Sequence, residues 1–308
     1  MPLKDIEPKD GFDAKTFLYI RTNPADDGTT PLQAGLIGWI SPDINITSNP
    51  SDTGAAIMNQ PNTVQVTISN AGGIQATDAL VDCFVADPTT AFTPLNATLI
   101  GQHFVTIPSY QTQNVEFTNW IPAMQGHFCL CARVSLIIPS DTYSNNQIFD
   151  VYGDRHIAQR NIHIVTMNAR VAHFGFTLAN PLTVDQEFEF ITKIEDANSK
   201  EIQKIQSIYK QKFAFSKEIN VNTNLYVGSD YKKDKSKEMG FGLLEKMPAL
   251  KIMKKNNSLT MKKGQVLYAA IEIDRTGISN KSKYSIINII QREKKSQRIV
   301  GGLTIVCL

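Results

Sequence analysis

The chain has 308 residues, of which 42% are hydrophobic and 19% are charged, and its formal net charge is +2. This length and composition allow two ordinary hydrophobic cores and exclude a globally disordered chain or a long coiled coil. No stretch approaches the roughly eighteen uninterrupted apolar residues of a membrane helix, and residues 1–7 lack the pattern of a secretory leader. We therefore expect no membrane span, and a protein that is either cytoplasmic or exported by a leaderless route.

The first half of the chain contains short segments in which apolar and polar residues alternate. Residues 1–35 are rich in Asp, Thr, Pro and Gly, and we interpret them as an N-terminal arm whose apolar run at 17–20 lends one strand to the domain behind it. Beyond the arm, the period of two is typical of strands with one buried face. The predicted strands are 62–70, 79–86, 98–107, 114–117, 128–137 and 161–165.

The second half continues this pattern, with one exception. Residues 199–213 place Ile202, Ile205, Tyr209 and Phe213 three and four apart behind a possible cap at Ser199, which predicts a short amphipathic helix. Residues 229–238 are strongly charged and predict a solvated loop. The predicted strands are 170–178, 187–194, 224–227, 265–273, 284–291 and 299–306. Many short strands at near-regular spacing favour a sandwich or barrel over a parallel sheet.

Several segments of the first half occur in the order found in a known bacterial module. They are an extended strand followed by Asn and Gly at 62–72, an apolar strand ending in Trp and Pro at 115–122, the next strand at 126–134, and the closing residues 145–146 and 157–161. Residues 36–166 thereby resemble CARDB, the cell-adhesion-related domain found in bacteria. The arm and an insertion around 139–154 depart from that pattern. The resemblance implies a seven-stranded immunoglobulin-like sandwich for adhesion, spacing or display, without catalytic residues.

We therefore predict an all-β protein with two tandem immunoglobulin-like β-sandwich domains and an extended N-terminal arm. The arm is 1–35, the CARDB-like sandwich 36–166, and a second, Lys-rich sandwich 167–308. The ending of the second domain, an apolar run at 289–291 followed by 299–304, is typical of a terminal hairpin.

The sharpest candidate for a metal site lies on one predicted strand. His127, Cys129 and Cys131 would share a strand face, and Cys83 could complete a tetrahedral zinc site. Zinc ligands usually come from tight turns, however, and cysteine in an apolar strand usually behaves as a small buried hydrophobe. With Cys307, the four cysteines are also too few for a disulfide scaffold. We therefore predict reduced, buried packing residues, with no metal and no cofactor.

Nothing else in the sequence forms a recognisable catalytic motif. No Gly-x-Ser-x-Gly elbow and no His-Glu-x-x-His helix occurs. We interpret Asp154-Arg155-His156 as a polar bend, and the glycine pairs 72–73 and 301–302 as turns. The remaining histidines are His103, His163 and His173. We predict no catalytic residues.

Two further groups of residues bear on possible partners. Four basic runs lie in the second half, and we favour solubilising loops over a polyanion-binding face because only Tyr231 could supply aromatic stacking within them. Trp39 and Trp120 could stack on a sugar ring if both were exposed, but their apolar surroundings favour packing. The basic runs contain Lys232, Lys233, Lys235 and Lys237; Lys251, Lys254 and Lys255; Lys262 and Lys263; and Lys294, Lys295 and Arg298.

The functional prediction is a non-catalytic bacterial protein that acts through its surface in adhesion, as a scaffold or in assembly. The expected partner is another protein or a second copy of the chain. A carbohydrate-binding accessory module is the alternative, so a polysaccharide remains a candidate ligand, whereas nucleic acid is disfavoured. A metal-dependent enzyme would depend entirely on the cluster at His127, Cys129 and Cys131.

Overall fold

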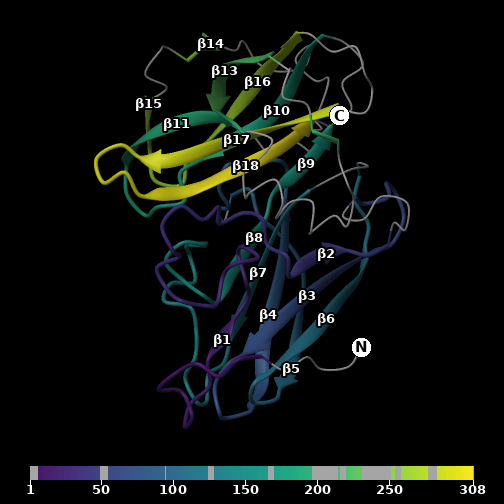
Figure 1. Cartoon of the computed structure of the whole chain (residues 1–308), viewed down its shortest axis with the longest axis vertical. Helices are drawn as coiled ribbons and strands as arrows, with labels where there is room; N and C mark the ends of the chain where they lie inside the picture. Colours follow the sequence, from purple (N-terminus) through teal and green to yellow (C-terminus); the bar gives the residue numbers. More distant parts are fainter. Residues whose placement is uncertain are drawn as a thin grey trace. The chain divides into compact units, whose positions relative to one another are not determined.

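The computed structural model describes residues 6–48, 55–93, 95–123, 128–165, 170–195, 214–215, 220–230, 251–253, 258–276 and 283–307. Within these ranges the regular elements are all β-strands (Figure 1), which confirms the all-β fold class. The helix predicted at 199–213 lies outside the described residues, as do residues 231–238 of the predicted loop. Ser229 and Asp230 of that loop instead end a strand. No helix in the described part of the chain is long and apolar enough to cross a membrane.

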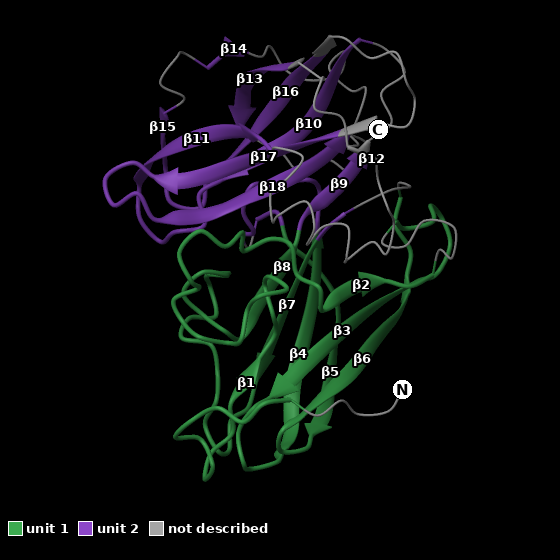
Figure 2. Cartoon of the chain, in the orientation of Figure 1, with its two compact units in different colours: residues 1–85, 97–126, 130–160 green, residues 86–96, 127–129, 161–308 purple. Residues whose placement is uncertain are grey.

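The chain forms two compact units (Figure 2). Unit 1 contains residues 1–85, 97–126 and 130–160, and unit 2 contains residues 86–96, 127–129 and 161–308. The predicted domain ranges, 1–35, 36–166 and 167–308, stay a prediction.

Unit 1 is a sandwich of two four-stranded sheets. In the first sheet, β6 pairs along β3, while β1 and β2 pair with separate parts of β3. The second sheet has the order β5-β4-β7-β8. Val64, Val66 and Ile68 of β3 are fully buried and alternate with half-buried polar residues, as the period of two predicts. The strands are β1 (Leu18–Tyr19), β2 (Ile44–Ile46), β3 (Asn62–Asn70), β4 (Ala76–Ala86), β5 (Thr98–Ile107), β6 (Gln111–Trp120), β7 (Cys129–Ser135) and β8 (Ile157–Arg160).

The N-terminal segment adds a short strand to the first sheet. Leu18 pairs with Asn70 and Tyr19 with Ser69, and Leu18 is fully buried. The turn after β3 has to be glycine because the arm crosses directly over it. A Cβ atom on Gly72 would lie 2.2 Å from the backbone oxygen of Lys15, which no side chain can tolerate.

Unit 2 is a second sandwich, with sheets ordered β10-β16-β13-β14 and β15-β11-β17-β18-β9. Its core is built from large apolar side chains of both sheets, including Phe176, Phe188, Ile271 and Ile289, all at most 1% exposed. The strands are β9 (Ile162–Val165), β10 (Val171–Ala179), β11 (Gln186–Ile194), β12 (Ala214–Phe215), β13 (Asn220–Asp230), β14 (Lys251–Ile252), β15 (Ser258–Met261), β16 (Val266–Thr276), β17 (Lys283–Glu293) and β18 (Ile299–Cys307).

The predicted terminal hairpin is confirmed, because β17 and β18 pair antiparallel, beginning with Ser285 opposite Cys307. The interpretation of the glycine pair 301–302 as a turn is wrong, since both residues lie inside β18. A Cβ atom on Gly301 would lie 2.2 Å from the backbone oxygen of Thr90, so this glycine permits a close backbone approach within the unit.

Candidate interaction surface

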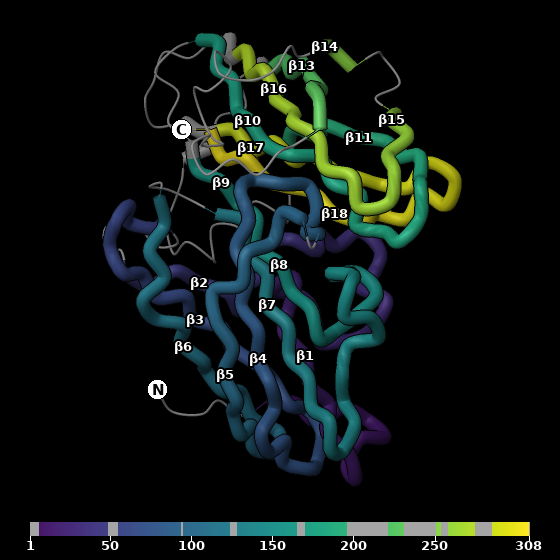
Figure 3. The backbone as a smooth tube through the Cα atoms, turned by 180° about the vertical axis from the view of Figure 1, so that it is seen from behind, coloured from purple at the N-terminus to yellow at the C-terminus, as the bar shows by residue number. Residues whose placement is uncertain are grey.

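Strand β5 is an open edge of unit 1, as is β6, which pairs with β3 alone in the described part of the chain. Within the described residues, β5 pairs with β4 alone and ends the order of its sheet; Figure 3 shows its path beside β4. Its ten residues, TLIGQHFVTI, include no Asp, Glu, Lys or Arg. Natural edge strands are usually protected from pairing by charges, by proline or by being very short. Strand β5 has no charge, no proline and ten residues, and its one such feature is the irregularity at Ile100 described below.

The two faces of β5 have different surroundings. On the inner face, the His103 ring meets the Phe117 ring with centroids 5.0 Å apart. The Gln102 side chain points the other way and donates to Oδ1 of Asp82 at 2.8 Å. Because side chains alternate along a strand, Phe104 shares the outer face with Gln102. Phe104 is 71% exposed, which places a large apolar ring in water.

Leu99 reaches the same outer face through an irregularity in the pairing. Cys83 pairs with Gly101 but Phe84 pairs with Leu99, so Ile100 is an extra residue in β5. Directly opposed residues share a face, and Leu99 therefore projects beside Phe84. Leu99 is 47% exposed. The outer face of β5 thus carries two exposed apolar side chains, one on either side of Gln102.

Next to this edge, the outer face of the sheet is fixed by Arg133 of β7. The guanidinium carbon lies 4.8 Å, 4.6 Å and 5.0 Å from the ring centroids of Phe84, Tyr143 and Phe149. The Nη2 atom donates to Oδ2 of Asp82 at 2.8 Å. Cation–π contacts of this kind strengthen when they are desolvated, and Arg133 is only 9% exposed. This cluster holds the insertion at 139–154 against the sheet.

The polar bend at residues 154–156 forms a second buried cluster in unit 1. Nδ1 of His156 lies 2.7 Å from Oδ1 of Asp154, and Nε2 lies 2.9 Å from Oδ1 of Asp141. Arg155 donates to the same Oδ1 of Asp141 at 2.5 Å, and the backbone N–H of Leu18 donates to Oδ2. The bend predicted from sequence is confirmed as the turn before β8, but its role in tying down the N-terminal arm was missed.

These contacts raise the pKa of His156 and lower the pKa values of Asp141 and Asp154. Burial disfavours the charged form of His156, but hydrogen bonds to Asp141 and Asp154 outweigh it and raise the pKa above its ordinary value of 6.5. Burial likewise opposes ionisation of Asp141 and Asp154, while hydrogen bonds from His156 lower both pKa values below 3.8. Both ring nitrogens are engaged, so this histidine has no free nitrogen to act as a general base.

Only some of the candidate zinc ligands lie within the described residues. His127 lies outside the described residues, and Cys83, Cys129 and Cys131 are fully buried free thiols. Burial raises the pKa of the Cys83 thiol well above its ordinary value, and it raises that of Cys131 in the same way. Across the described ranges, no three His, Cys, Asp or Glu side chains are grouped so that they could hold a metal ion.

The other predicted candidates are dispersed. His163 of unit 2 bonds Asn161 at 2.6 Å, and His173 lies 3.1 Å from Glu272. Trp39 is fully buried and Trp120 is half-buried, so they do not form the exposed pair that sugar stacking would require. Among the described lysines, Lys294 is paired with Glu187 at 2.7 Å. Residues Lys232, Lys233, Lys235, Lys237, Lys254 and Lys255 lie outside the described residues.

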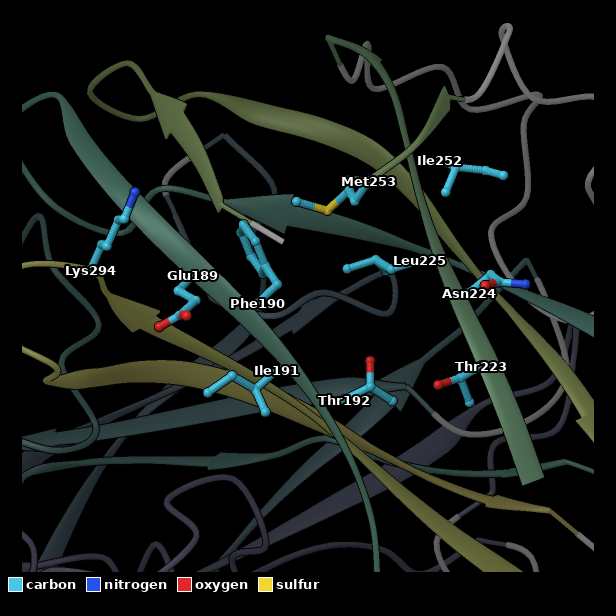
Figure 4. Close-up of a pocket in the computed structure, with 10 residues that line it drawn as sticks. All are labelled: Glu189, Phe190, Ile191, Thr192, Thr223, Asn224, Leu225, Ile252, Met253 and Lys294. Atoms are coloured by element: carbon cyan, nitrogen blue, oxygen red, sulfur yellow. The ribbon is translucent and has the colours of Figure 1, made fainter. Parts of the chain in front are cut away.

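Unit 2 contains a cavity of about 720 Å³ between β11 and β13 (Figure 4). Phe190, Leu225 and Met253 point toward one another in its interior, and Thr192 and Thr223 line it as well. Its two charged lining residues are engaged elsewhere, because Glu189 pairs with Arg292 and Lys294 with Glu187. The cavity offers an apolar floor and neutral hydroxyl groups, and no acid–base pair for chemistry. Its lining residues are Glu189, Phe190, Ile191, Thr192, Thr223, Asn224, Leu225, Ile252, Met253 and Lys294.

Comparison with solved structures finds β-sandwich proteins. The CARDB domain of the PF1109 protein from Pyrococcus furiosus, solved in complex with di-metal ions, is 17% identical over 33% of this chain and 76% of that chain, with a TM-score of 0.24. The enterotoxigenic Escherichia coli adhesin CfaE is 7% identical over 99% and 97%, with a TM-score of 0.24. The CupB6 tip adhesin of Pseudomonas aeruginosa is 8% identical over 86% and 98%, with a TM-score of 0.19.

The matches to the CARDB domain cover about a third of this chain. At these identities the likeness concerns the fold alone. No family model matches the chain, and no curated protein matches it. The fold defines an all-β sandwich protein, and the solved structures to which it is similar include a CARDB domain and two adhesins.

Proposed function

We propose that this chain is a non-catalytic bacterial assembly component that associates with protein partners through the edge of its first sandwich. The observation that carries the proposal is the open, uncharged strand β5 with Leu99 and Phe104 exposed on its outer face. Association along a strand edge pairs the backbone groups of that edge, while exposed side chains supply apolar contact.

The exposure of Phe104 to water has a cost in free energy. Fully burying a Phe side chain is worth roughly 1.5–3 kcal/mol relative to leaving it exposed. Phe104 contributes little to the core of unit 1, because it faces away from Phe117 and is 71% exposed. A protein interface would remove this apolar surface from water.

The alternative of a carbohydrate-binding module is less well supported. Sugar recognition by stacking needs an accessible aromatic face, and Trp39 is fully buried. Phe104 is accessible, but the amide of its neighbour Gln102 is already bonded to Asp82. We therefore favour protein association at this edge.

The proposal is tested by measuring molar mass by light scattering over a range of concentrations, together with capture by partners from the native host. Phe104→Lys should weaken association at least tenfold, because the charge would have to be buried at the interface. Val184→Lys is the matched control, since it places the same charge at a 56% exposed position of unit 2. Association that is equal in both variants, or absent from the unmodified chain with every partner tried, would overturn the proposal.

A further inference from the structure

We propose that the partner of β5 is β5 of a second copy of this chain, paired antiparallel about a two-fold axis near Gln102. This inference rests on the proposed function and specifies the occupant of the edge. It joins two four-stranded sheets into one continuous sheet across the dimer. A two-fold arrangement closes on itself, because the same patch serves both copies.

The absence of charged side chains on β5 makes this edge compatible with a second copy of itself. An edge that is to meet a copy of itself must contain no uncompensated charge, since each charge would face its own kind. Residues 98–107 contain no Asp, Glu, Lys or Arg. On the neighbouring strand, Asp82 is neutralised by Arg133 at 2.8 Å and lies behind Gln102. The middle of the edge is therefore self-compatible.

The second argument is the placement of the exposed apolar side chains. Leu99 and Phe104 lie on the outer face, on opposite sides of Gln102 along the strand. Antiparallel pairing about Gln102 reverses the order in the second copy, so Phe104 of each copy comes beside Leu99 of the other. Aromatic–aliphatic cross-strand pairs are among those that stabilise sheets.

The third argument distinguishes antiparallel from parallel pairing. Asp78 is exposed on β4, beside the end of β5 that contains Val105 and Ile107. Antiparallel pairing places the two copies of Asp78 at opposite ends of the joint sheet. Parallel pairing about a two-fold axis would instead turn the two outer faces to opposite sides of the joint sheet, so Phe104 would not meet Leu99 of the other copy.

Cysteine cross-linking tests the geometry directly. Gln102→Cys should form an intermolecular disulfide on mild oxidation, because opposed residues near the axis have Cβ atoms about 4.5–5.5 Å apart, and a small local movement brings them to the roughly 3.5–4.5 Å that a disulfide spans. Thr106→Cys should not, because the two copies of residue 106 would lie eight residues apart along the joint sheet, or roughly 27 Å. The native cysteines provide a low background, since all four are buried. Gln102→Ser controls for loss of the bond to Asp82.

The outcomes separate the inference from the proposed function. Cross-linking at 102 and not at 106, with dimers seen by light scattering under reducing conditions, supports antiparallel pairing. Cross-linking at both positions would indicate a contact without this register and overturn the inference. Association that persists without cross-linking at 102 would also overturn it, while the proposed function would stand with another geometry or partner. A chain that binds neither itself nor another protein would overturn both the inference and the proposed function.

Discussion

His156 and Asp141 meet in a buried contact, with Nε2 of the histidine 2.9 Å from Oδ1 of the aspartate. The other ring nitrogen is 2.7 Å from Asp154. An imidazole can donate from both nitrogens only when it is protonated. The cluster therefore requires a charged histidine between two charged carboxylates, and Asp141 in turn holds the backbone of Leu18.

The stability of unit 1 should consequently have an optimum in pH. The folded-state pKa of His156 is raised above 6.5, so its contribution is complete below that value and is lost as the pH rises through the folded-state pKa. The pKa values of Asp141 and Asp154 are lowered below 3.8, so their contribution is present above that value and is lost as the pH falls through the lowered pKa values. The free energy of unfolding, measured by urea denaturation from pH 3 to 9, should fall on both the acidic and the alkaline side of this optimum.

Replacement of the histidine should remove the alkaline side of this profile. His156→Gln leaves Asp141 paired with Arg155 alone and removes the cationic partner of Asp154, and should cost about 3–5 kcal/mol. His173→Gln is the matched control, because His173 contacts Glu272 in unit 2 with both side chains partly exposed. A wild-type profile that stays level between pH 6 and 9 would contradict the assigned role.

Arg133 should be among the costliest charged residues of unit 1 to replace. Arg133→Ala would leave Asp82 buried without its cationic partner and remove three aromatic contacts. We expect a loss of about 3–5 kcal/mol in the free energy of unfolding, and faster proteolysis within residues 139–154. Arg292→Ala should cost at most about 1 kcal/mol, since its pair with Glu189 is half-exposed. Equal losses in the two variants would count against the packing argument.

The strands could largely be predicted from the sequence, because the period of two reports directly on one buried face. Strands β3 and β5 have the predicted bounds, 62–70 and 98–107. The pair Gly301–Gly302 was misinterpreted because a glycine in a strand that receives a close backbone has the same sequence signature as a turn. That difference depends on Thr90, some two hundred residues away, which no local pattern contains.

The candidate surface could not be predicted in the same way. The sequence of β5 looks like that of any buried strand, and its position at an edge follows from the order of the sheet. The buried cluster at His156 was missed for a related reason, since Asp141 and Leu18 approach it only after folding. The missing charge in residues 98–107 was the one available signal, because it can be read directly from the sequence.

The two tryptophans should respond differently to truncation. The apolar surroundings of both residues in the sequence favour packing. In the structure, Trp39 is fully buried whereas Trp120 is half-buried. Trp39→Ala should cost about 3–5 kcal/mol, the usual loss for a buried large aromatic side chain. Trp120→Ala should cost less, because part of the ring is already in water. Thermal unfolding followed by fluorescence of the remaining tryptophan measures both changes, and a larger loss for Trp120 would reverse the assignment.

The buried cysteines provide the last prediction. Cys83 and Cys131 are fully buried, and burial raises the pKa of both thiols. Because the thiolate is the form that reacts with disulfide reagents and binds metals, neither should react in the native protein within the time that an unfolded sample reacts fully. A metal chelator should leave the melting temperature unchanged, since no metal binding energy would be coupled to folding.

Substitution separates packing from ligation at the same positions. Cys131→Val changes volume slightly and should cost less than about 1.5 kcal/mol if the residue only packs. Cys131→Ser keeps the size but buries an extra hydroxyl, so it should be the more destabilising of the two. A ligand site would give the opposite pattern: one equivalent of zinc per chain, destabilisation by chelator, and the same loss from either substitution. Metal analysis of the purified chain decides between these outcomes, and stoichiometric zinc would make Cys131 a ligand rather than a packing residue.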